Sequence, residues 1–184
     1  MSVLAQKNIL IGVSGGIAAY KIPLLIRQLV KLKSNVKVVM TPSSKEFVTP
    51  LTLSTVSKNE VFSEFTTEKN SNPTWSKHVE QADWADIFII APATSNTISS
   101  MANARCDNLL LACYLSSTCP VFVAPAMDLE MYKSISTKNN IILTVITILL
   151  VLIVNKNSYS SENLKDEAYY YDCLLYTSPS PRDS

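Results

Sequence analysis

The stretch "ILIGVSGGIAAYK", residues 9–21, holds all three glycines of this 184-residue chain, Gly12, Gly15 and Gly16. Average usage of about 7% would give a chain of this length roughly a dozen glycines. An apolar run precedes the glycines and an apolar helical pattern follows them. The stretch therefore predicts a buried strand, a tight turn and the start of a helix. Glycine in such a turn permits close backbone approach and positive φ, which we expect at Gly15 and Gly16.

The same alternation continues along the chain. We expect a helix after the glycines, which Pro23 either kinks or delays. Residues 61–77 are polar and predict no regular element, whereas two helices broken near 103–107 are expected before the last strand. Alternating apolar strands and helices predict a single α/β domain, an open parallel sheet with helices on both faces. The expected strands are 8–13, 35–40, 86–93 and 120–127.

A turn between a strand and a helix directs backbone N–H groups and the positive end of the helix toward an anion, here most simply a phosphate. Ser14 adds a hydroxyl donor to this turn. The spacing is G-x-x-G-G, and "TPSS" rather than an acidic residue follows the second strand. A dinucleotide site has G-x-G-x-x-G and an acid for the ribose. The residues therefore favour a mononucleotide such as FMN over NAD.

Ligands of open α/β sheets lie at the carboxyl ends of the strands. The segments there are "VSGGIA", "TPSS", "APATSNT" and "APAMDLEMY". The repeated Ala-Pro-Ala in the last two has two interpretations. It is either a similar exit from two strands, where proline stops the ladder, or a sign that both loops converge on one ligand.

Composition excludes several classes of protein. A net charge of +1 with no basic cluster argues against nucleic-acid binding. Four cysteines without a CxxC pair argue against a metal site or a disulfide framework and favour a reducing cytoplasm. We expect Cys106, Cys113 and Cys119 to be buried apolar residues. The apolar run at 141–154 has 14 residues, fewer than the roughly 17–25 of a membrane span, so we expect no membrane contact.

Five segments carry a resemblance to a known family: "GVSGGIAAYK", "TPLTLSTVS", "HVEQADWADIFIIAPATSNTI", "MANARCDNLLLACYL" and "VFVAPAMDLEMY". They cover about residues 7–140 in order and resemble the flavin-containing cysteine decarboxylases. The closest similarity is to the flavoprotein domain that decarboxylates phosphopantothenoylcysteine, which in bacteria is usually the first half of a bifunctional decarboxylase and ligase. The resemblance implies a Rossmann-like fold and a trimer-based homo-oligomer with FMN at the subunit interface.

The resemblance also implies the roles of individual residues. His78, the only histidine, matches the catalytic histidine of the family, although a lone histidine in a sequence is more often a surface or packing residue. Histidine neutral near pH 7 can accept a proton. Asp128 and Met131 match the substrate-contacting motif, in which the family most often has asparagine at the Asp128 position. The implied FMN-binding residues are Ser14, Gly15, Gly16, Ile17, Thr41, Ser43, Thr94, Ser95, Asn96, Thr97 and Ala126.

The implied activity is FMN-dependent decarboxylation of 4'-phosphopantothenoylcysteine to 4'-phosphopantetheine in coenzyme A biosynthesis, a carbon–carbon lyase reaction. Two alternatives stay open: a flavin-binding subunit that regulates a partner without catalysis, and a related flavin prenyltransferase. The family also has an Ala-Cys-Gly loop that serves the closing reduction. The sequence holds no counterpart of it, which implies an incomplete activity.

The resemblance divides the chain into three parts. Residues 1–140 are expected to form the FMN-binding domain. Residues 141–172 are expected to be a frame-shifted or disordered segment. Residues 173–184, which include "CLLYTSPSPRD", look like a translated sequencing adapter and are expected not to be native.

Overall fold

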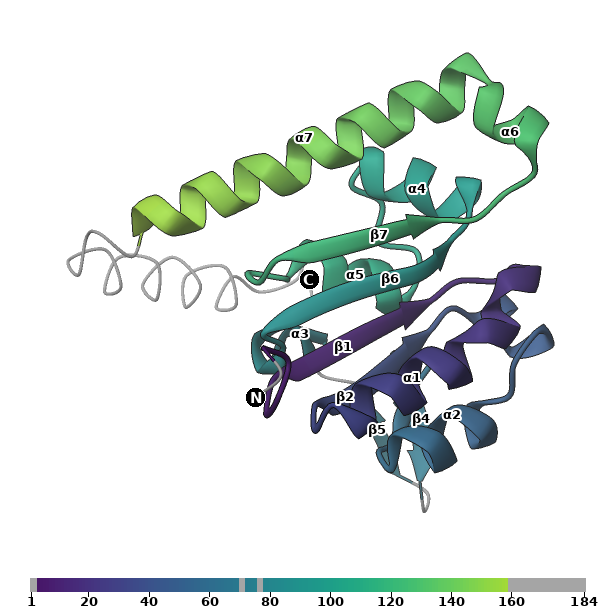
Figure 1. Ribbon diagram of the computed structural model, residues 1–184, viewed down its shortest axis with the longest axis vertical. Coiled ribbons are helices and arrows are strands. Elements are labelled where there is room, and N and C mark those ends of the chain that lie inside the picture. Colours follow the sequence, from purple (N-terminus) through teal and green to yellow (C-terminus); the bar gives the residue numbers. More distant parts are fainter. Residues whose placement is uncertain (1–2, 70–71, 76–77, 159–184) are drawn as a thin grey trace, which may run out of the picture.

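The computed structural model of the protein describes residues 3–69, 72–75 and 78–158. Within this part of the chain, five strands form one parallel sheet in the order β3-β2-β1-β6-β7. Figure 1 shows the sheet with helices on both faces. The open parallel α/β architecture is therefore confirmed. The strands are β1 (Asn8–Val13), β2 (Asn35–Met40), β3 (Val61–Phe62), β6 (Ile87–Ala93) and β7 (Val121–Pro125).

Side chains of β1 alternate between two cores, as the period of a strand requires. Ile9, Ile11 and Val13 pack in a cluster with the helix α1 (Ile22–Lys31) and with α2 (Pro50–Ser57). Leu10 belongs to the other cluster, on the opposite face of the sheet. That face is covered by three helices, α3 (His78–Trp84), α4 (Ser95–Ala102) and α5 (Leu109–Leu115).

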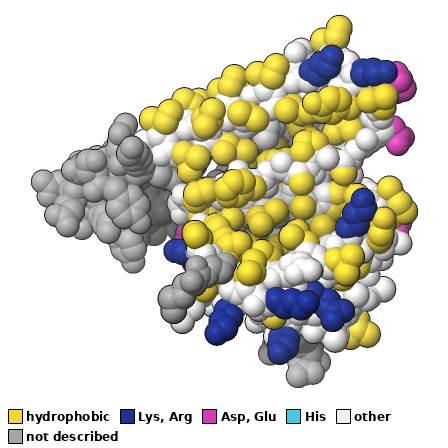
Figure 2. Space-filling model, in the orientation of Figure 1, with side chains coloured by type: hydrophobic (Ala, Val, Ile, Leu, Met, Phe, Trp, Pro, Cys, Tyr) yellow, Lys and Arg dark blue, Asp and Glu magenta, His cyan; other side chains and the backbone are white. Residues whose placement is uncertain are grey.

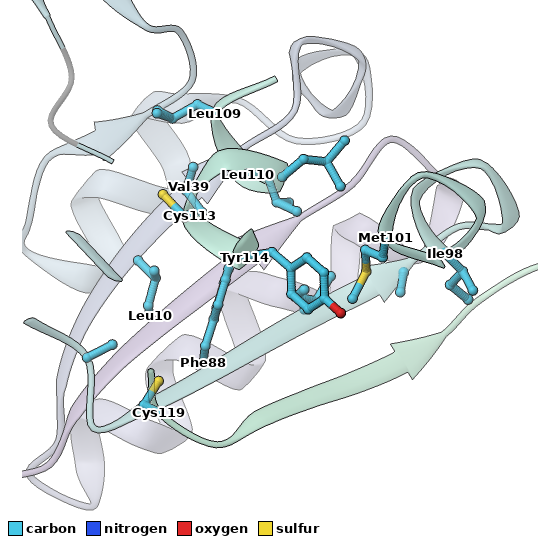
Figure 3. Packing of buried hydrophobic residues seen from close by; sticks show 14 residues of the cluster. Leu10, Val39, Phe88, Ile98, Met101, Leu109, Leu110, Cys113, Tyr114 and Cys119 are labelled. Carbon is cyan, nitrogen blue, oxygen red and sulfur yellow. The ribbon is translucent and has the colours of Figure 1, made fainter. Parts of the chain in front are cut away.

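Helix α5 is buried almost entirely, and Figure 3 shows its side chains packed over Phe88 of the central sheet. Burial raises the pKa of the Cys113 thiol to about 12, so this cysteine is an apolar core residue. Burial also raises the pKa of Cys119. The expectation of buried cysteines is wrong for Cys106, which is exposed in the loop between α4 and α5.

The chain after the glycines first forms a short 3₁₀ helix, η1 (Ile17–Lys21), and α1 begins only at Ile22. Pro23 stands in the first turn of α1, where the missing N–H has no helical partner to lose. Of the two effects expected from this proline, a late start is the one observed. After β2, a second 3₁₀ helix, η2 (Pro42–Glu46), precedes α2.

The segment 61–77 differs from the irregular segment expected. Val61 and Phe62 form β3, which pairs in parallel with β2. The strands β4 (Thr66–Lys69) and β5 (Asn72–Trp75) then form an antiparallel hairpin. The polar composition of this segment gave no sign of either feature. A two-residue strand and a small hairpin outside the main sheet can form their backbone hydrogen bonds without an alternating apolar pattern in the sequence.

The last described elements are α6 (Leu129–Lys133) and the 24-residue α7 (Ile135–Ser158). The apolar run at 141–154 lies within α7, and the helix continues through residues 140 and 141 without a break. By length and composition, the helix segment 135–153 could cross a membrane, and only 11% of its most apolar window is buried against the rest of the protein. The length argument from the sequence, which considered 14 residues, therefore does not exclude a membrane.

Among the residues that the structure describes, four adopt positive φ, and none of them is glycine: Gln6 (φ 63°), Lys33 (φ 65°), Lys58 (φ 60°) and Ala104 (φ 50°). Lys58 terminates α2 in the left-handed conformation, a position that glycine usually occupies. The left-handed turns of this chain are thus made by residues with a Cβ atom, at some cost in backbone strain.

Asp86 ties the start of β6 to the start of β1. Its carboxylate accepts a hydrogen bond of 2.8 Å from the Asn8 N–H and lies 3.4 Å from the Lys7 ammonium. The Asn8 hydrogen bond holds the pKa of Asp86 below its ordinary value. A lowered pKa means that the stabilisation is complete above the ordinary pKa of aspartate and is lost as the pH falls through the lowered value.

We predict that Asp86→Ala lowers the free energy of unfolding by about 1 kcal/mol at pH 7, a value reduced for the exposure of the side chain. Below pH 4 the difference in free energy of unfolding between the variant and the parent should become smaller, because the Asp86 carboxylate of the parent becomes protonated. Urea unfolding at several pH values measures both effects. The control is Asp83→Ala, at an exposed position of α3, whose free energy of unfolding should be within about 0.5 kcal/mol of that of the parent. A loss that is independent of pH would contradict the assigned role of the carboxylate.

Candidate functional site

A pocket of about 320 Å³ lies where β1, β2 and β6 end and four loops meet. The glycine turn after β1, η2 after β2, the first turn of α4 after β6 and the start of α5 form its walls. The pocket brings together most of the residues expected to hold the cofactor. The lining residues are Gly15, Thr41, Pro42, Ser43, Thr94, Asn96, Thr97, Ser100, Asp107, Asn108 and Leu111.

The pocket lies at the point where the strand order reverses. From β1 the chain moves outward through β2 to β3, and it then returns to the other side of β1 with β6 and β7. Loops on the two sides of such a switch point diverge and leave a crevice at the carboxyl ends of the strands. The topology therefore explains why the cavity is here.

Ser14 joins the two sides of the crevice. Its fully buried hydroxyl donates to the Pro92 carbonyl at 2.5 Å and accepts from the Thr94 N–H at 3.1 Å. The Ser14 N–H also donates to the Pro92 carbonyl, at 3.3 Å. Because its hydroxyl hydrogen is used within the protein, Ser14 fixes the pocket walls here instead of donating to a ligand.

Gly15 is required by the close approach of two loops. A Cβ atom at Gly15 would collide with the Ser43 side chain and lie 2.9 Å from the Ser43 carbonyl carbon. At Gly16 a Cβ would lie 3.0 Å from the Thr94 methyl group. The expected positive φ is wrong, because no glycine has it and Gly16 is extended (φ −165°, ψ 159°). These two glycines are therefore needed because they lack a Cβ atom, which lets the loops approach closely, and not because they adopt a left-handed backbone conformation.

Hydroxyl and amide groups dominate the pocket walls. Thr94 caps α4, accepting from the Thr97 N–H at 3.4 Å, and the two hydroxyls lie 3.1 Å apart. The Thr41 and Ser43 hydroxyls lie 3.2 Å apart. Asn108 caps α5, accepting from the Leu111 N–H at 3.1 Å. Since α4 begins at the pocket, the positive end of its dipole is directed there.

The lining residues in the described chain include one charged side chain, Asp107, which pairs with Arg105 at 2.9 Å. Neither a lysine nor an arginine is among them. In residues 3–69, 72–75 and 78–158, no group of three or more His, Cys, Asp or Glu side chains could hold a metal ion. An anion in this pocket would therefore be bound by neutral hydrogen-bond donors and helix N-termini.

Several predicted site residues do not line the pocket. Ile17 and Ser95 adjoin it in sequence; the Ile17 side chain is 76% exposed, and the Ser95 hydroxyl lies 3.3 Å from that of Thr137 on α7. His78 begins α3, where its ring meets Phe65 edge to face with centroids 6.3 Å apart.

Ala126, Asp128 and Met131 follow β7, beside the loop after β6. The Ala126 N–H donates to the Ala93 carbonyl at 2.9 Å, which holds the two Ala-Pro-Ala exits together. Asp128 and Met131 are exposed. A single copy thus gathers the loops expected to hold FMN but leaves His78, Asp128 and Met131 outside the pocket.

Reasoning from the sequence missed five lining residues. Two of them, Asp107 and Asn108, stand directly before the apolar run of α5. An Asp or Asn at this position is a helix-start signal, and the start of a helix that follows a polar loop could have been recognised as a pocket wall. The others are Pro42, Ser100 and Leu111.

Comparison with known proteins agrees with this geometry. A family model described as Flavoprotein matches residues 2–157. The chain belongs to the flavoprotein family. The match continues beyond residue 140, and the domain boundary expected there stays a prediction.

The curated relatives of this flavoprotein include two informative matches. It is 45% identical over 139 residues to the coenzyme A biosynthesis bifunctional protein CoaBC of Bacillus subtilis (strain 168), covering 76% of this chain and 34% of the relative. It is 43% identical over 139 residues to a probable phosphopantothenoylcysteine decarboxylase of Streptococcus mutans, covering 74% of this chain and 76% of that protein. The chain therefore spans about a third of the length of the bifunctional relatives that it matches.

Among solved structures, the FMN-dependent cysteine decarboxylase SpaF has the same fold. The TM-score is 0.71 at 26% identity, covering 79% of this chain and 82% of SpaF. This similarity confirms the Rossmann-like flavoprotein fold.

We predict that Ser14→Ala lowers the free energy of unfolding by about 1–3 kcal/mol, because it leaves the Thr94 N–H without its acceptor in a buried site. Ser43→Ala, at an exposed hydroxyl of the opposite wall, should change stability by less than about 0.5 kcal/mol. Urea unfolding of the two variants in the same buffer gives the comparison. Equal stability of both variants would show that the Ser14 bridge does not hold the crevice.

Proposed function

We propose that this flavoprotein binds FMN in the pocket at the switch point and decarboxylates 4'-phosphopantothenoylcysteine, a step of coenzyme A biosynthesis. The observation that carries the proposal is the convergence of the glycine turn, the Thr41–Ser43 loop and the Thr94–Thr97 loop on one cavity whose lining includes no lysine or arginine. The relatives named for coenzyme A biosynthesis and for phosphopantothenoylcysteine decarboxylation support this substrate.

The residues present fit FMN. Gly15 leaves room beside Ser43 that a side chain would fill, and the hydroxyls and N–H groups around it suit the phosphate of a mononucleotide. The volume of about 320 Å³ is within the roughly 300–1,000 Å³ of small-molecule sites. Ile17, which is 76% exposed beside the pocket, offers an apolar contact for the flavin ring.

FMN, when bound, supplies an oxidant for the cysteine unit of the substrate, which makes loss of carbon dioxide easy. The protein orients the substrate and manages its protons. We assign proton acceptance to His78 and substrate contact to Asp128 and Met131. Asp128 is exposed at the start of α6, and no hydrogen bond from its side chain caps this helix. A carboxylate here would repel a substrate carboxylate that it faced, so Asp128 contacts the substrate at another group.

The positions of these residues support an assembly of several copies. His78, Asp128 and Met131 do not line the pocket of their own chain, and Ile17 and Met131 expose apolar surface near the carboxyl edge of the sheet. A trimer-based homo-oligomer with FMN at the interface would bring the catalytic residues of one copy to the FMN loops of another. We place this assembly in the cytoplasm.

The separation of His78 from the pocket favours a second candidate, a flavin-binding subunit without catalytic activity. It would bind FMN through the same loops and regulate a partner. Bound FMN without release of carbon dioxide from the substrate distinguishes this candidate from the decarboxylase.

We predict that Gly15→Ala weakens FMN binding at least tenfold, because the added Cβ pushes the glycine turn away from Ser43. Gly16→Ala should weaken it less, since its Cβ would approach one side-chain atom, the Thr94 methyl carbon at 3.0 Å, and no backbone atom within that range. Titration of flavin fluorescence with each purified variant measures the two dissociation constants. A parent protein that is folded yet fails to bind added FMN would refute the proposed cofactor.

We predict that His78→Asn keeps FMN and the fold but lowers the rate of carbon dioxide release from phosphopantothenoylcysteine at least about a hundredfold, the usual scale for loss of a general base. Single-turnover assays with flavin-loaded protein measure this rate. Phe65→Leu, which removes the ring beside His78, is the matched control and should lower the rate much less. Equal rates in parent and His78→Asn would make His78 a structural residue.

A further inference from the structure

Helix α7 presents an apolar face that the described part of the chain leaves uncovered. We call this face the outer stripe; it runs from residue 142 to residue 153, in the middle of the helix, and carries no charge, because the segment 139–155 contains no Asp, Glu, Lys or Arg. Figure 2 shows apolar side chains gathered along α7. The stripe consists of side chains that are 38–56% exposed: Ile142, Leu143, Val145, Ile146, Leu149, Leu150, Val151 and Ile153.

The opposite face of α7 is fixed to the domain. Thr137 and Thr144 are 5% and 2% exposed. The Thr137 hydroxyl lies 3.3 Å from that of Ser95, and the Thr144 hydroxyl donates to the Ile98 carbonyl at 3.4 Å. Because α7 is held on α4 in this way, the outer stripe is a rigid ridge with a defined orientation.

An apolar groove of about 280 Å³ runs beside this ridge, between α7 and the edge strand β7. Phe122 of β7 is 58% exposed at its wall. The groove shares no residue with the pocket at the carboxyl ends of the strands. Its lining consists of Ile98, Val121, Phe122, Val123, Pro125, Ile141, Thr144, Val145, Ile148 and Leu149.

We propose that the outer stripe and this groove form a self-association surface, in which the α7 ridge of each copy lies in the groove of the other. A ridge next to a groove of the same chemistry is complementary to itself under two-fold rotation, as an isologous interface requires. The eight half-exposed side chains of the stripe offer roughly 700 Å² per copy, close to the about 800 Å² per partner of a standard interface.

A second copy suits this surface better than a lipid surface does. A bilayer surface is flat at this scale and would leave the groove unfilled. The stripe from residue 142 to residue 153 is also about 18 Å long, too short for the roughly 30 Å of a hydrocarbon core. A spanning arrangement of the whole helix would break the buried hydrogen bonds of Thr137 and Thr144.

The test compares the mass of the full 184-residue chain with that of Ile146→Glu by analytical ultracentrifugation over a range of concentrations. At equal concentration the parent should form an assembly of at least twice the mass of that formed by Ile146→Glu, because each copy then makes one further two-fold contact with another copy. Leu24→Glu is the control, because Leu24 is 63% exposed on α1, away from the ridge and groove. It should behave as the parent. Circular dichroism shows that each variant is folded.

A complementation experiment tests the ridge-in-groove geometry itself. Phe122→Lys alters the groove and should abolish the doubling by itself, as Ile146→Glu does in the ridge. Mixed in equal amounts, the two variants should associate again, because a glutamate ridge then meets a lysine groove while the second contact of the pair is unaltered. Equal masses of parent and Ile146→Glu, or no association in the mixture, would overturn the proposal. So would flotation of the parent with phosphatidylcholine vesicles without any change of mass in solution.

Discussion

The buried Ser14 hydroxyl holds together the region on which the site depends. It connects the exit of β1 to the exit of β6, the two strands at which the chain reverses its direction across the sheet. Because these two strand ends are fixed relative to each other, the glycine turn lies close to Ser43, and the first turn of α4 lines the same cavity. The pocket is therefore a consequence of strand order and one hydrogen-bonded bridge, and its polar residues take their positions from that frame.

Much of the fold follows from local patterns in the sequence. The strands 8–13, 35–40 and 86–93 are mostly apolar, as burial on both faces of a parallel sheet requires. The hairpin at 66–75 carries no comparable signal, because its strands lie outside the main sheet. The paired strand at Val61 depends on its neighbour β2 rather than on its own two residues. Long-range pairing of this kind cannot be inferred from local composition.

The candidate site likewise has a part that the sequence predicts and a part that depends on tertiary contacts. Gly15, Thr41 and Thr94 were predictable, since each stands where an expected strand ends. The reason why glycine is needed at position 15 was not predictable, because the approach of Ser43 is a tertiary contact. The sequence suggested a positive φ angle instead, which no glycine has. His78 and Asp128 were identified by resemblance, and a linear motif could not show that they lie outside the pocket of their own copy. Sequence motifs name the members of a site, whereas only the fold shows which members share one chain's cavity.

The use of glycine in this chain has a consequence for its evolution. Gly15 and Gly16 provide space where the loops of the site meet, and Gly12 leaves room for core side chains of α5 and β6. The left-handed turns at Gln6, Lys33, Lys58 and Ala104 are made by residues other than glycine. Glycine thus stands where two segments approach closely, and it is absent from the four described positions where a left-handed backbone would favour it. Replacing one of these four residues by glycine would relieve backbone strain and so raise the stability of the protein, far from the pocket. The protein can consequently tolerate costly changes in its binding loops, provided that the distant turns change as well.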